Sequence, residues 1–251
     1  MKIETLQELP LQFIENILVN EENAGWSKAG AENILSFLAS HQNDFYYLGL
    51  YAEELAGVLV YRPEDLRLIM IGVAKEKRNQ GYGTELINAL KKKAEDLHLA
   101  RVEANAASNA LGFYQANGFE EAGEAADAGG MQFTPVEYLL GKEMLGKSVT
   151  VTVDHPYGSF HPTIADAIYP VNFGYVSAPV ACNDGMQDAW VIGPQEPVET
   201  FTGVVAGIVY HKNGDSRWIV IQQGMMVNHE QIINLIGFEE QYYETKIIWA
   251  D

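Results

Sequence analysis

Residues 73–84 read VAKEKRNQGYGT, and this stretch decides the fold of the first half of the chain. Before it, residues 66–73 are nearly all apolar, which is typical of a central strand covered on both faces. After it, Leu86, Leu90 and Ala94 recur at helical spacing, with Lys91-Lys92-Lys93 alongside. A turn from a strand into a helix directs successive backbone N–H groups at one point, and the helix N-terminus adds about half a positive charge. The stretch therefore predicts a binding site for an anionic diphosphate.

Two glycines and three cations suit this turn to phosphate. Gly81 and Gly83 let the backbone approach a ligand without a Cβ in the way. Lys75, Lys77 and Arg78 concentrate positive charge in a chain whose formal net charge is −18. Other phosphate motifs do not fit, because the Gly-Lys-Ser/Thr of a nucleotide P-loop is missing and a leucine replaces the third glycine of a dinucleotide-binding turn.

The flanking sequence predicts a mixed α/β unit. Residues 3–20 have helical spacing, and Ser27 can cap a second helix. Two aromatic and β-branched runs, 45–51 and 55–61, read as a hairpin. Further strands are expected at 101–105 and 131–140, with a helix at 108–117 that ends at Asn117-Gly118.

Beyond Gly141 the pattern changes to short strands. Residues 149–153 alternate with threonine, and strand-like runs at 190–193, 202–210 and 217–222 are separated by Gly, Pro and Asn-Gly turns. Only 229–245 looks helical. We expect a boundary near 142–148, which divides the chain into an α/β (α+β) domain, 1–145, and a β-rich domain, 147–251.

Composition narrows the partners and the compartment. With 34 acidic against 16 basic residues, the surface repels nucleic acid, and no apolar run is long enough to cross a membrane. A single cysteine, Cys182, excludes an internal disulfide and a cysteine zinc cluster. The opening MKIETLQELP lacks the regions of a signal peptide. We expect a cytoplasmic protein with no nucleic-acid or membrane partner.

Two motifs resemble those of the GNAT superfamily of N-acetyltransferases. Arg78-x-x-Gly81-x-Gly83 resembles its acetyl-CoA loop, and the Phe113-Tyr114 pair followed by Gly118-Phe119 resembles its helix-to-strand signature. The order of expected elements is also similar, over residues 1–145. The resemblance implies transfer of acetyl from acetyl-CoA to a small-molecule or peptide amine, with the central strand splayed from its neighbour to admit the pantetheine.

The resemblance also implies site residues. Tyr114 would protonate the departing thiolate, as a phenol of pKa about 10 can do toward a thiol of pKa about 8.5. The general base is open: Glu103 is the candidate, and an outward-facing strand glutamate is the alternative. Ala107 replaces an asparagine that contacts the cofactor in many members. The cofactor-binding set that the resemblance implies, through backbone groups, is Ile71, Val73, Arg78, Asn79, Gln80, Gly81, Tyr82, Gly83 and Thr84.

The tail resembles the small OB-like β-barrel of soluble inorganic pyrophosphatases, over residues 147–246. The matching stretches include Tyr169-Pro-Val-Asn-Phe-Gly-Tyr and Asp184-Gly-Met-Gln-Asp188. In that family clustered aspartates hold Mg²⁺, and here Asp184, Asp188 and Asp215 are the candidate ligands. A metal aspartate and several phosphate donors of the family are replaced, so we expect an impaired site.

These observations predict an acetyl-CoA-dependent N-acetyltransferase with a pyrophosphatase-like accessory domain. Two alternatives stay open. One is an acyl-CoA-sensing protein without turnover, and the other is a bifunctional enzyme whose second domain is a working Mg²⁺-dependent pyrophosphatase. The sequence leaves the amine acceptor unassigned and a homodimer open.

Overall fold

The computed structural model describes residues 1–20, 28–128, 131–177, 186–226 and 228–250. They form two compact units. The first comprises Met1–Asp96 and Arg101–Leu139, and the second comprises Leu97–Ala100 and Leu140–Asp251. The boundary expected within 142–148 lies a few residues beyond Leu139. In the described part of the chain, no helix is long and apolar enough to cross a bilayer.

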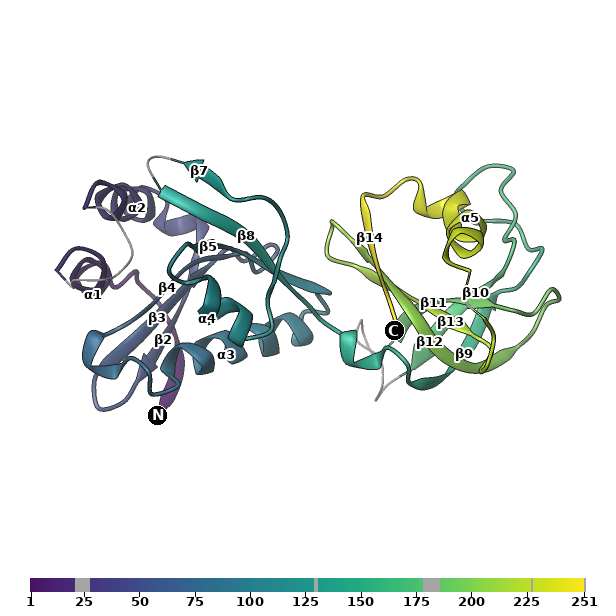
Figure 1. Ribbon diagram of the computed structural model, residues 1–251, viewed down its shortest axis with the longest axis horizontal. Coiled ribbons are helices and arrows are strands. Elements are labelled where there is room, and N and C mark those ends of the chain that lie inside the picture. Colours follow the sequence, from purple (N-terminus) through teal and green to yellow (C-terminus); the bar gives the residue numbers. More distant parts are fainter. Residues whose placement is uncertain (21–27, 129–130, 178–185, 227, 251) are drawn as a thin grey trace. The chain divides into compact units, whose positions relative to one another are not determined.

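The first unit alternates strands and helices (Figure 1). Its elements in chain order are β1 (Lys2–Leu6), α1 (Leu11–Glu15), η1 (Asn16–Asn20), α2 (Lys28–Ser40), η2 (Gln42–Asp44), β2 (Tyr46–Tyr51), β3 (Leu55–Tyr61), β4 (Leu68–Val73), η3 (Lys75–Lys77), α3 (Tyr82–Asp96), β5 (Arg101–Ala107), α4 (Leu111–Ala116), β6 (Glu120–Glu121), β7 (Ala126–Ala128) and β8 (Met131–Leu139).

One sheet collects the described strands of this unit in the order β1-β2-β3-β4-β5-β8-β6, with β7 beside β8. The hairpin predicted at 45–61 is confirmed as β2 and β3. The helix predicted over residues 3–20 is wrong at its start, because Lys2–Leu6 pairs along its whole length with β2. The apolar residues of β1 and of the helical segment that follows it happen to have helical spacing when they are taken together, although they belong to two elements. Ser27, expected as a cap of α2, lies outside the described residues.

Helices cover both faces of the sheet. On one face, Ile14 and Leu38 of α1 and α2 join a buried cluster with Val58, Val60 and Met70 of the strands. On the other face lies α3, and a Cβ at Gly57 of β3 would come within 3.1 Å of Leu86. The apolar stripe of α3 read from the sequence is confirmed, because Leu86, Ile87, Leu90 and Ala94 are all buried. The sheet thus forms the middle layer of an α/β sandwich.

A β-bulge disturbs the centre of this sheet. Across β3 and β4, Val60 lies opposite Met70 and Tyr61 opposite Leu68, so Ile69 is an extra residue in β4. An extra residue bends the strand that carries it. Immediately before the bulge, Leu68 and Ala104 make the one pairing recorded between the parallel strands β4 and β5. The two strands therefore separate from Leu68 onward, as the splay implied by the resemblance requires.

The second unit is a small β-barrel. After η4 (Lys142–Met144) its elements are β9 (Ser148–His155), β10 (Asn172–Ser177), β11 (Met186–Ile192), β12 (Thr200–His211), β13 (Ser216–Ile221), α5 (His229–Glu240) and β14 (Thr245–Trp249). The described strands run in the order β13-β11-β10-β9-β12, and β12 pairs again with β13, which closes the ring. A ring of this kind leaves no free edge among its members, and β14 adds to β12 outside it.

The helix predicted over 229–245 ends early. It stops at Glu240, and Thr245–Trp249 is a strand that pairs with Gly207–His211 of β12. Apolar residues there serve a long-range pairing that no local period reveals. α5 places Ile232 and Ile236 in a buried core that also contains Trp190.

Candidate functional site

Backbone groups of β4 face β5 along the stretch where the two strands separate. Ala74 N–H donates to Ala56 of the chain beside β4 at 2.9 Å. Because successive residues of an antiparallel pair point their backbone groups to opposite edges, Gly72 and Met70 share that direction, and Val73 and Ile71 face β5. Beyond Leu68, no pairing with β5 is recorded for the described part of β4. Ile71 and Val73, the two residues expected at the pantetheine, thus lie on an open strand edge.

β4 is not covered equally on its two faces, contrary to the sequence expectation. Leu68, Met70 and Gly72 are buried, whereas Ile71 and Val73 are only half-buried. The half-buried pair lies on the α3 side of the sheet, where Val73 approaches Gly57. An apolar surface of two side chains therefore accompanies the open backbone edge.

The turn after β4 curls into α3 through two left-handed residues. Asn79 has φ 58° and Gly81 has φ 85°. The Arg78 side chain folds back, and its Nε donates to the Val73 carbonyl at 3.1 Å. This bond ties the turn to the open end of β4. At Gly81 the reason for a glycine is the backbone conformation and not a lack of space, since nothing lies within 4 Å of where a Cβ would be.

The start of α3 presents backbone donors. Glu85 N–H donates to the Gly81 carbonyl at 3.0 Å, which is the first helical hydrogen bond at this end. The N–H groups of Tyr82, Gly83 and Thr84 precede it and belong to the first turn, whose donors have no helical acceptor. A 15-residue helix adds its dipole at the same place. The geometry fits an anion such as a diphosphate.

The missing side chain of Gly83 leaves room for packing. A Cβ there would lie 3.0 Å from the Phe113 ring, closer than ordinary contact. Phe113 belongs to α4, so α4 packs against the first turn of α3. This contact places α4, which also carries Tyr114, beside the helix that presents the backbone donors.

Tyr114 sits at the end of α4, in a Schellman motif. Phe119 N–H donates to the Tyr114 carbonyl at 3.0 Å, and Gly118 N–H donates to the Gln115 carbonyl at 2.9 Å. Gly118 has φ 79°, the left-handed conformation that this motif requires. The Tyr114 and Phe119 rings pack edge to face with centroids 5.3 Å apart. The Phe-Tyr and Gly-Phe pairs of the sequence are thus two ends of one helix stop.

The Tyr114 side chain is buried, with 4% of its surface exposed. Burial disfavours the charged phenolate and raises the pKa of Tyr114 well above its ordinary value. At neutral pH the group carries its proton, which is the state that a general acid needs.

Glu103 lies on β5 in an ion-pair cluster. Its carboxylate accepts from Arg67 Nη1, and Arg101 Nη1 is 3.6 Å away. Arg67 also donates to Asn105 Oδ1 at 3.1 Å. Glu103 is therefore held between two guanidinium groups.

Lys91 is a residue that the sequence placed only beside the apolar stripe of α3. Its Nζ lies 2.5 Å from the Asn117 carbonyl and 3.7 Å from the centroid of the Tyr138 ring. Burial lowers the pKa of Lys91. The sequence signal was weak, because Lys91, Lys92 and Lys93 are adjacent and only the structure separates them.

The second unit has a polar hollow of about 220 Å³. Asp188, Asp215, Arg217 and Tyr243 are among its lining residues, so the structure brings together two of the three expected metal ligands. The third, Asp184, lies outside the described residues. No group of three or more His, Cys, Asp or Glu side chains arranged for a metal ion occurs among the residues that are described.

Charges around the hollow are unevenly balanced. Burial raises the pKa of Asp188, as do Asp154, Asp215 and Glu239 nearby, while Arg217 opposes the rise. Arg217 is engaged elsewhere, with Glu239 at 2.7 Å and Glu240 at 3.0 Å.

Glu240 is the centre of the ion-pair network beside this hollow. It accepts from Trp190 Nε1 at 2.9 Å, and its other oxygen lies 2.7 Å from His211 Nε2. Burial alone would raise the pKa of Glu240, but His211, Arg217 and Trp190 outweigh it and the pKa is lowered. The positive charge of Arg217, which lines the hollow, is thus already balanced by Glu239 and Glu240 of α5.

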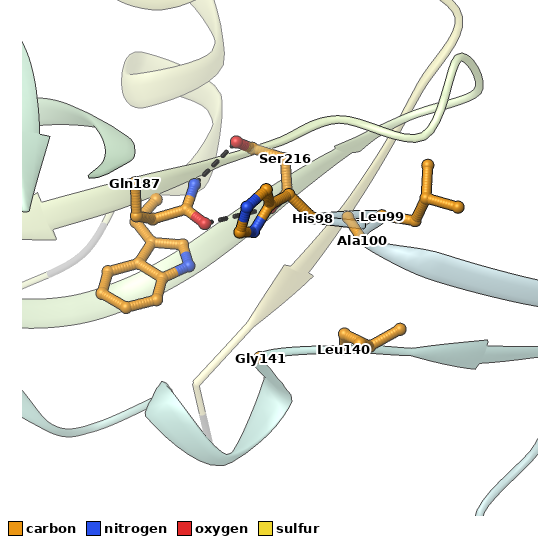
Figure 2. A pocket seen from close by; sticks show the side chains of 8 residues that line it. His98, Leu99, Ala100, Leu140, Gly141, Gln187 and Ser216 are labelled. Atoms are coloured by element: carbon orange, nitrogen blue, oxygen red, sulfur yellow. Dashed lines mark hydrogen bonds between the residues drawn. The ribbon is translucent and has the colours of Figure 1, made fainter. Parts of the chain in front are cut away.

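A second cavity in this unit holds about 10 Å³, which is room for roughly one water molecule (Figure 2). Gln187 and Ser216 line it, and Gln187 Nε2 donates to the Ser216 carbonyl at 2.7 Å. Its walls include His98, Leu99 and Ala100 from the short segment between α3 and β5. The cavity is too small for a ligand.

Comparison with known families identifies the first half of the chain. Residues 18–140 match the family model of an acetyltransferase (GNAT) domain. The chain therefore contains a GNAT acetyltransferase domain, which takes in the splayed strands, the turn 74–81, α3 and α4. No curated protein matches the sequence significantly.

Three solved structures that are similar to the chain are distant from it in sequence. A GCN5-related N-acetyltransferase from Rhodopseudomonas palustris is 19% identical with a TM-score of 0.47, over 55% of this chain and 95% of its own. An acetyltransferase from Bacillus subtilis in complex with CoA is 20% identical with a TM-score of 0.42, over 55% and 98%. A ribosomal-protein-alanine N-acetyltransferase from Brucella melitensis is 21% identical with a TM-score of 0.42, over 56% and 100%.

Proposed function

We propose that the protein is an acetyl-CoA-dependent N-acetyltransferase that acts on a primary amine. The observation that carries the proposal is the separation of β4 from β5 after Leu68, next to the N-terminus of α3. The open edge of β4 is followed along the chain by the N–H donors at the start of α3. Such a pair suits a ligand that has an amide-bearing arm and a diphosphate, since the arm can add to the edge and the anion can accept from the donors.

Each residue has a part in this proposal. Backbone groups of Ile71 and Val73 hold the pantetheine, and the N–H groups of residues 78–84 hold the diphosphate. Acetyl-CoA supplies an activated thioester. Tyr114 donates its proton to the departing thiolate, because burial keeps the phenol protonated at neutral pH. The acceptor is an amine, and the acidic surface favours a cationic one such as a polyamine or an amino sugar.

Thr84→Asp tests the anion site without disturbing the fold. Thr84 is exposed in the first turn of α3. A carboxylate at this place stabilises the helix through its dipole but repels a diphosphate. We expect acetyl-CoA to raise the melting temperature of the native protein and to lose this effect on the variant. Asn88→Asp, exposed one turn further along α3, is the matched control and should keep the full shift. A full shift in Thr84→Asp would place the diphosphate elsewhere.

Tyr114→Phe tests the proton donor. Removing one hydroxyl should lower turnover about 100-fold, the lower end for general acid catalysis, and leave cofactor affinity nearly unchanged. The assay follows thiol release from acetyl-CoA with spermidine, glucosamine and a peptide with a free N-terminus. Equal turnover of both proteins with an accepted amine would remove Tyr114 from the mechanism.

A second candidate function is acyl-CoA sensing without turnover. It is favoured by Glu103, the candidate base, which lies between Arg67 and Arg101 in ion pairs. The two functions differ in one measurement, since a sensor gives the acetyl-CoA melting shift and releases no thiol with any amine of the panel.

For the second unit we propose an OB-like, pyrophosphatase-like accessory domain whose catalytic site is impaired. Asp188 and Asp215 could hold one Mg²⁺, with Asp184 as a further ligand by the resemblance. Arg217 is held by Glu239 and Glu240, which leaves little positive charge for a polyanion. The full chain with pyrophosphate and excess Mg²⁺ should release phosphate no faster than a blank. Rapid release that is lost in Asp188→Asn would instead make the protein a bifunctional enzyme.

A further inference from the structure

Lys91 joins α3 to the end of α4. Its Nζ lies 2.5 Å from the carbonyl oxygen of Asn117, the C-cap residue of α4. The same ammonium lies 3.7 Å from the centroid of the Tyr138 ring and 5.8 Å from that of Phe119. One cation therefore contacts the last turn of α4, the residue that leaves it and a strand of the sheet.

The contact matches the electrostatics of a helix end. Carbonyls of the last turn have no helical donor, and the C-terminus of a helix carries partial negative charge. Lys91 supplies both a donor and a positive charge there. A Cβ at Gly118 would lie 3.8 Å from the Lys91 Nζ and 3.4 Å from Tyr138, so the lysine and the Tyr138 ring both pack beside this left-handed glycine.

The same helix end holds Tyr114. The Tyr114 carbonyl accepts from Phe119 N–H at 3.0 Å, and the two rings pack with centroids 5.3 Å apart. Phe119 packs in turn on Tyr138, with centroids 5.7 Å apart. Lys91 thus touches two of the three aromatic residues in the stack that ends at Tyr114.

We propose that Lys91 is a positioning residue for Tyr114, which it holds in place for proton donation by fixing the C-terminal end of α4. This rests on the proposed role of Tyr114 as general acid. Lys91 acts through Asn117, Phe119 and Tyr138 and not through contact with substrate. Burial lowers the pKa of the lysine, so keeping its charge at this place has a cost.

Lys92 offers a matched control on the same helix. It is exposed and pairs with Asp96 at 2.6 Å and Glu95 at 3.6 Å, all on α3. Lys91→Met and Lys92→Met remove the same charge from adjacent positions with a side chain of similar length. Lys91→Arg keeps the charge and the donors, and so reports whether these are what matters.

The experiment has one readout on chemistry and one on the tyrosine itself. Turnover is measured as thiol release from acetyl-CoA with spermidine, glucosamine and the free-amine peptide. Independently, ¹⁹F NMR of the 3-fluorotyrosine-labelled protein reports the surroundings of Tyr114, with its signal assigned by its loss in Tyr114→Phe. Melting temperatures with and without acetyl-CoA show that each variant is folded and binds the cofactor.

We expect Lys91→Met to lower kcat about tenfold with the KM for acetyl-CoA nearly unchanged, because a misplaced donor affects the chemical step. The Tyr114 signal should move in Lys91→Met, stay in Lys92→Met and return toward its native position in Lys91→Arg. An unmoved signal in Lys91→Met overturns the proposal, as does a Lys91→Arg variant no better than Lys91→Met. If no amine of the panel is acetylated, the proposed function fails with that panel, and the ¹⁹F signal still decides the positioning role.

Discussion

Gly118 holds a backbone conformation that side chains with a Cβ rarely adopt. It has φ 79°, while a Cβ there would meet the Tyr138 ring only at the ordinary contact distance of 3.4 Å, so the strain of a substitution comes from the backbone. Gly118→Ala should therefore lower the free energy of unfolding by about 1 to 2 kcal/mol. Gly112, on the same helix, has nothing within 4 Å of a Cβ and is a matched control.

Gly112→Ala should be neutral or stabilising by up to about 1 kcal/mol, because alanine loses less backbone entropy in a helix. Denaturant unfolding of both variants measures the difference. Equal effects of the two substitutions would show that the helix stop does not depend on Gly118.

Asp188 predicts a pH dependence whose sign follows from its raised pKa. The folded protein holds the proton of Asp188 more tightly than the unfolded chain, so ionisation near neutral pH costs stability. Asp188→Asn should raise the melting temperature at pH 7. The gain should shrink as the pH falls through the raised pKa toward the ordinary value of 3.8, because the native residue is then neutral in both states. A gain that is constant with pH would contradict this account.

At this scale the sequence was most informative where chemistry is local. The pairs Phe113-Tyr114 and Gly118-Phe119 could be read because a helix stop needs its glycine and its hydrophobic contact at fixed offsets. Lys91 could not be distinguished from Lys92, since the acceptor at Asn117 lies 26 residues away. For Glu103 the sequence left two possibilities open, a general base or an outward-facing strand glutamate, and it gave no sign of the ion pairs with Arg67 and Arg101.

The central element of the first unit is β4, whose two edges have different partners. Met70 and Gly72 direct their N–H groups to β3, whereas those of Ile71 and Val73 face the open edge. Hydrogen exchange should therefore alternate along the strand, slow at Met70 and Gly72 and faster at Ile71 and Val73. Acetyl-CoA should slow the two exposed amides. Uniform protection along β4 without ligand would show that the strands are closed.

The existence of β4 was predictable, but its bulge was not. Ile69 is as apolar as its neighbours, so the extra residue leaves no mark on the composition of the strand. The sequence predicted helix where the structure has β1, and it did not predict β14, for a similar reason. Both are short runs whose strand character comes from pairing with distant segments, Tyr47–Tyr51 and Gly207–His211.

On the scale of the whole chain, the second unit includes four residues that lie between α3 and β5. Ala100 N–H donates to the Gly214 carbonyl at 2.7 Å, and the Ala100 carbonyl accepts from Leu140 N–H at 2.8 Å. Both bonds lie within the second unit. The domain limits expected from the sequence, 1–145 and 147–251, did not foresee this segment, because nothing in its composition separates it from the helix before it.

Ala100→Pro should therefore destabilise the barrel from a position in the first half of the sequence. Proline removes the donor to Gly214, which should cost about 1 to 3 kcal/mol. Fluorescence of Trp190 and Trp218, both buried in the barrel, reports its unfolding. Leu97→Ala, at an exposed neighbour, is the control. A barrel transition that is unchanged in Ala100→Pro would make the segment a passive connector.

The placement of Leu97–Ala100 has a consequence for how such a chain could be recombined. Two domains joined end to end can be exchanged by one crossover at the linker. Here a crossover near 145 would transfer the barrel without Leu97–Ala100, the segment that accepts from Leu140 and donates to Gly214. That segment would stay in the gene segment that encodes the first unit. A viable chimera needs two matched exchanges, one around residues 97–100 and one after β8. The two halves are thus expected to be inherited as a pair.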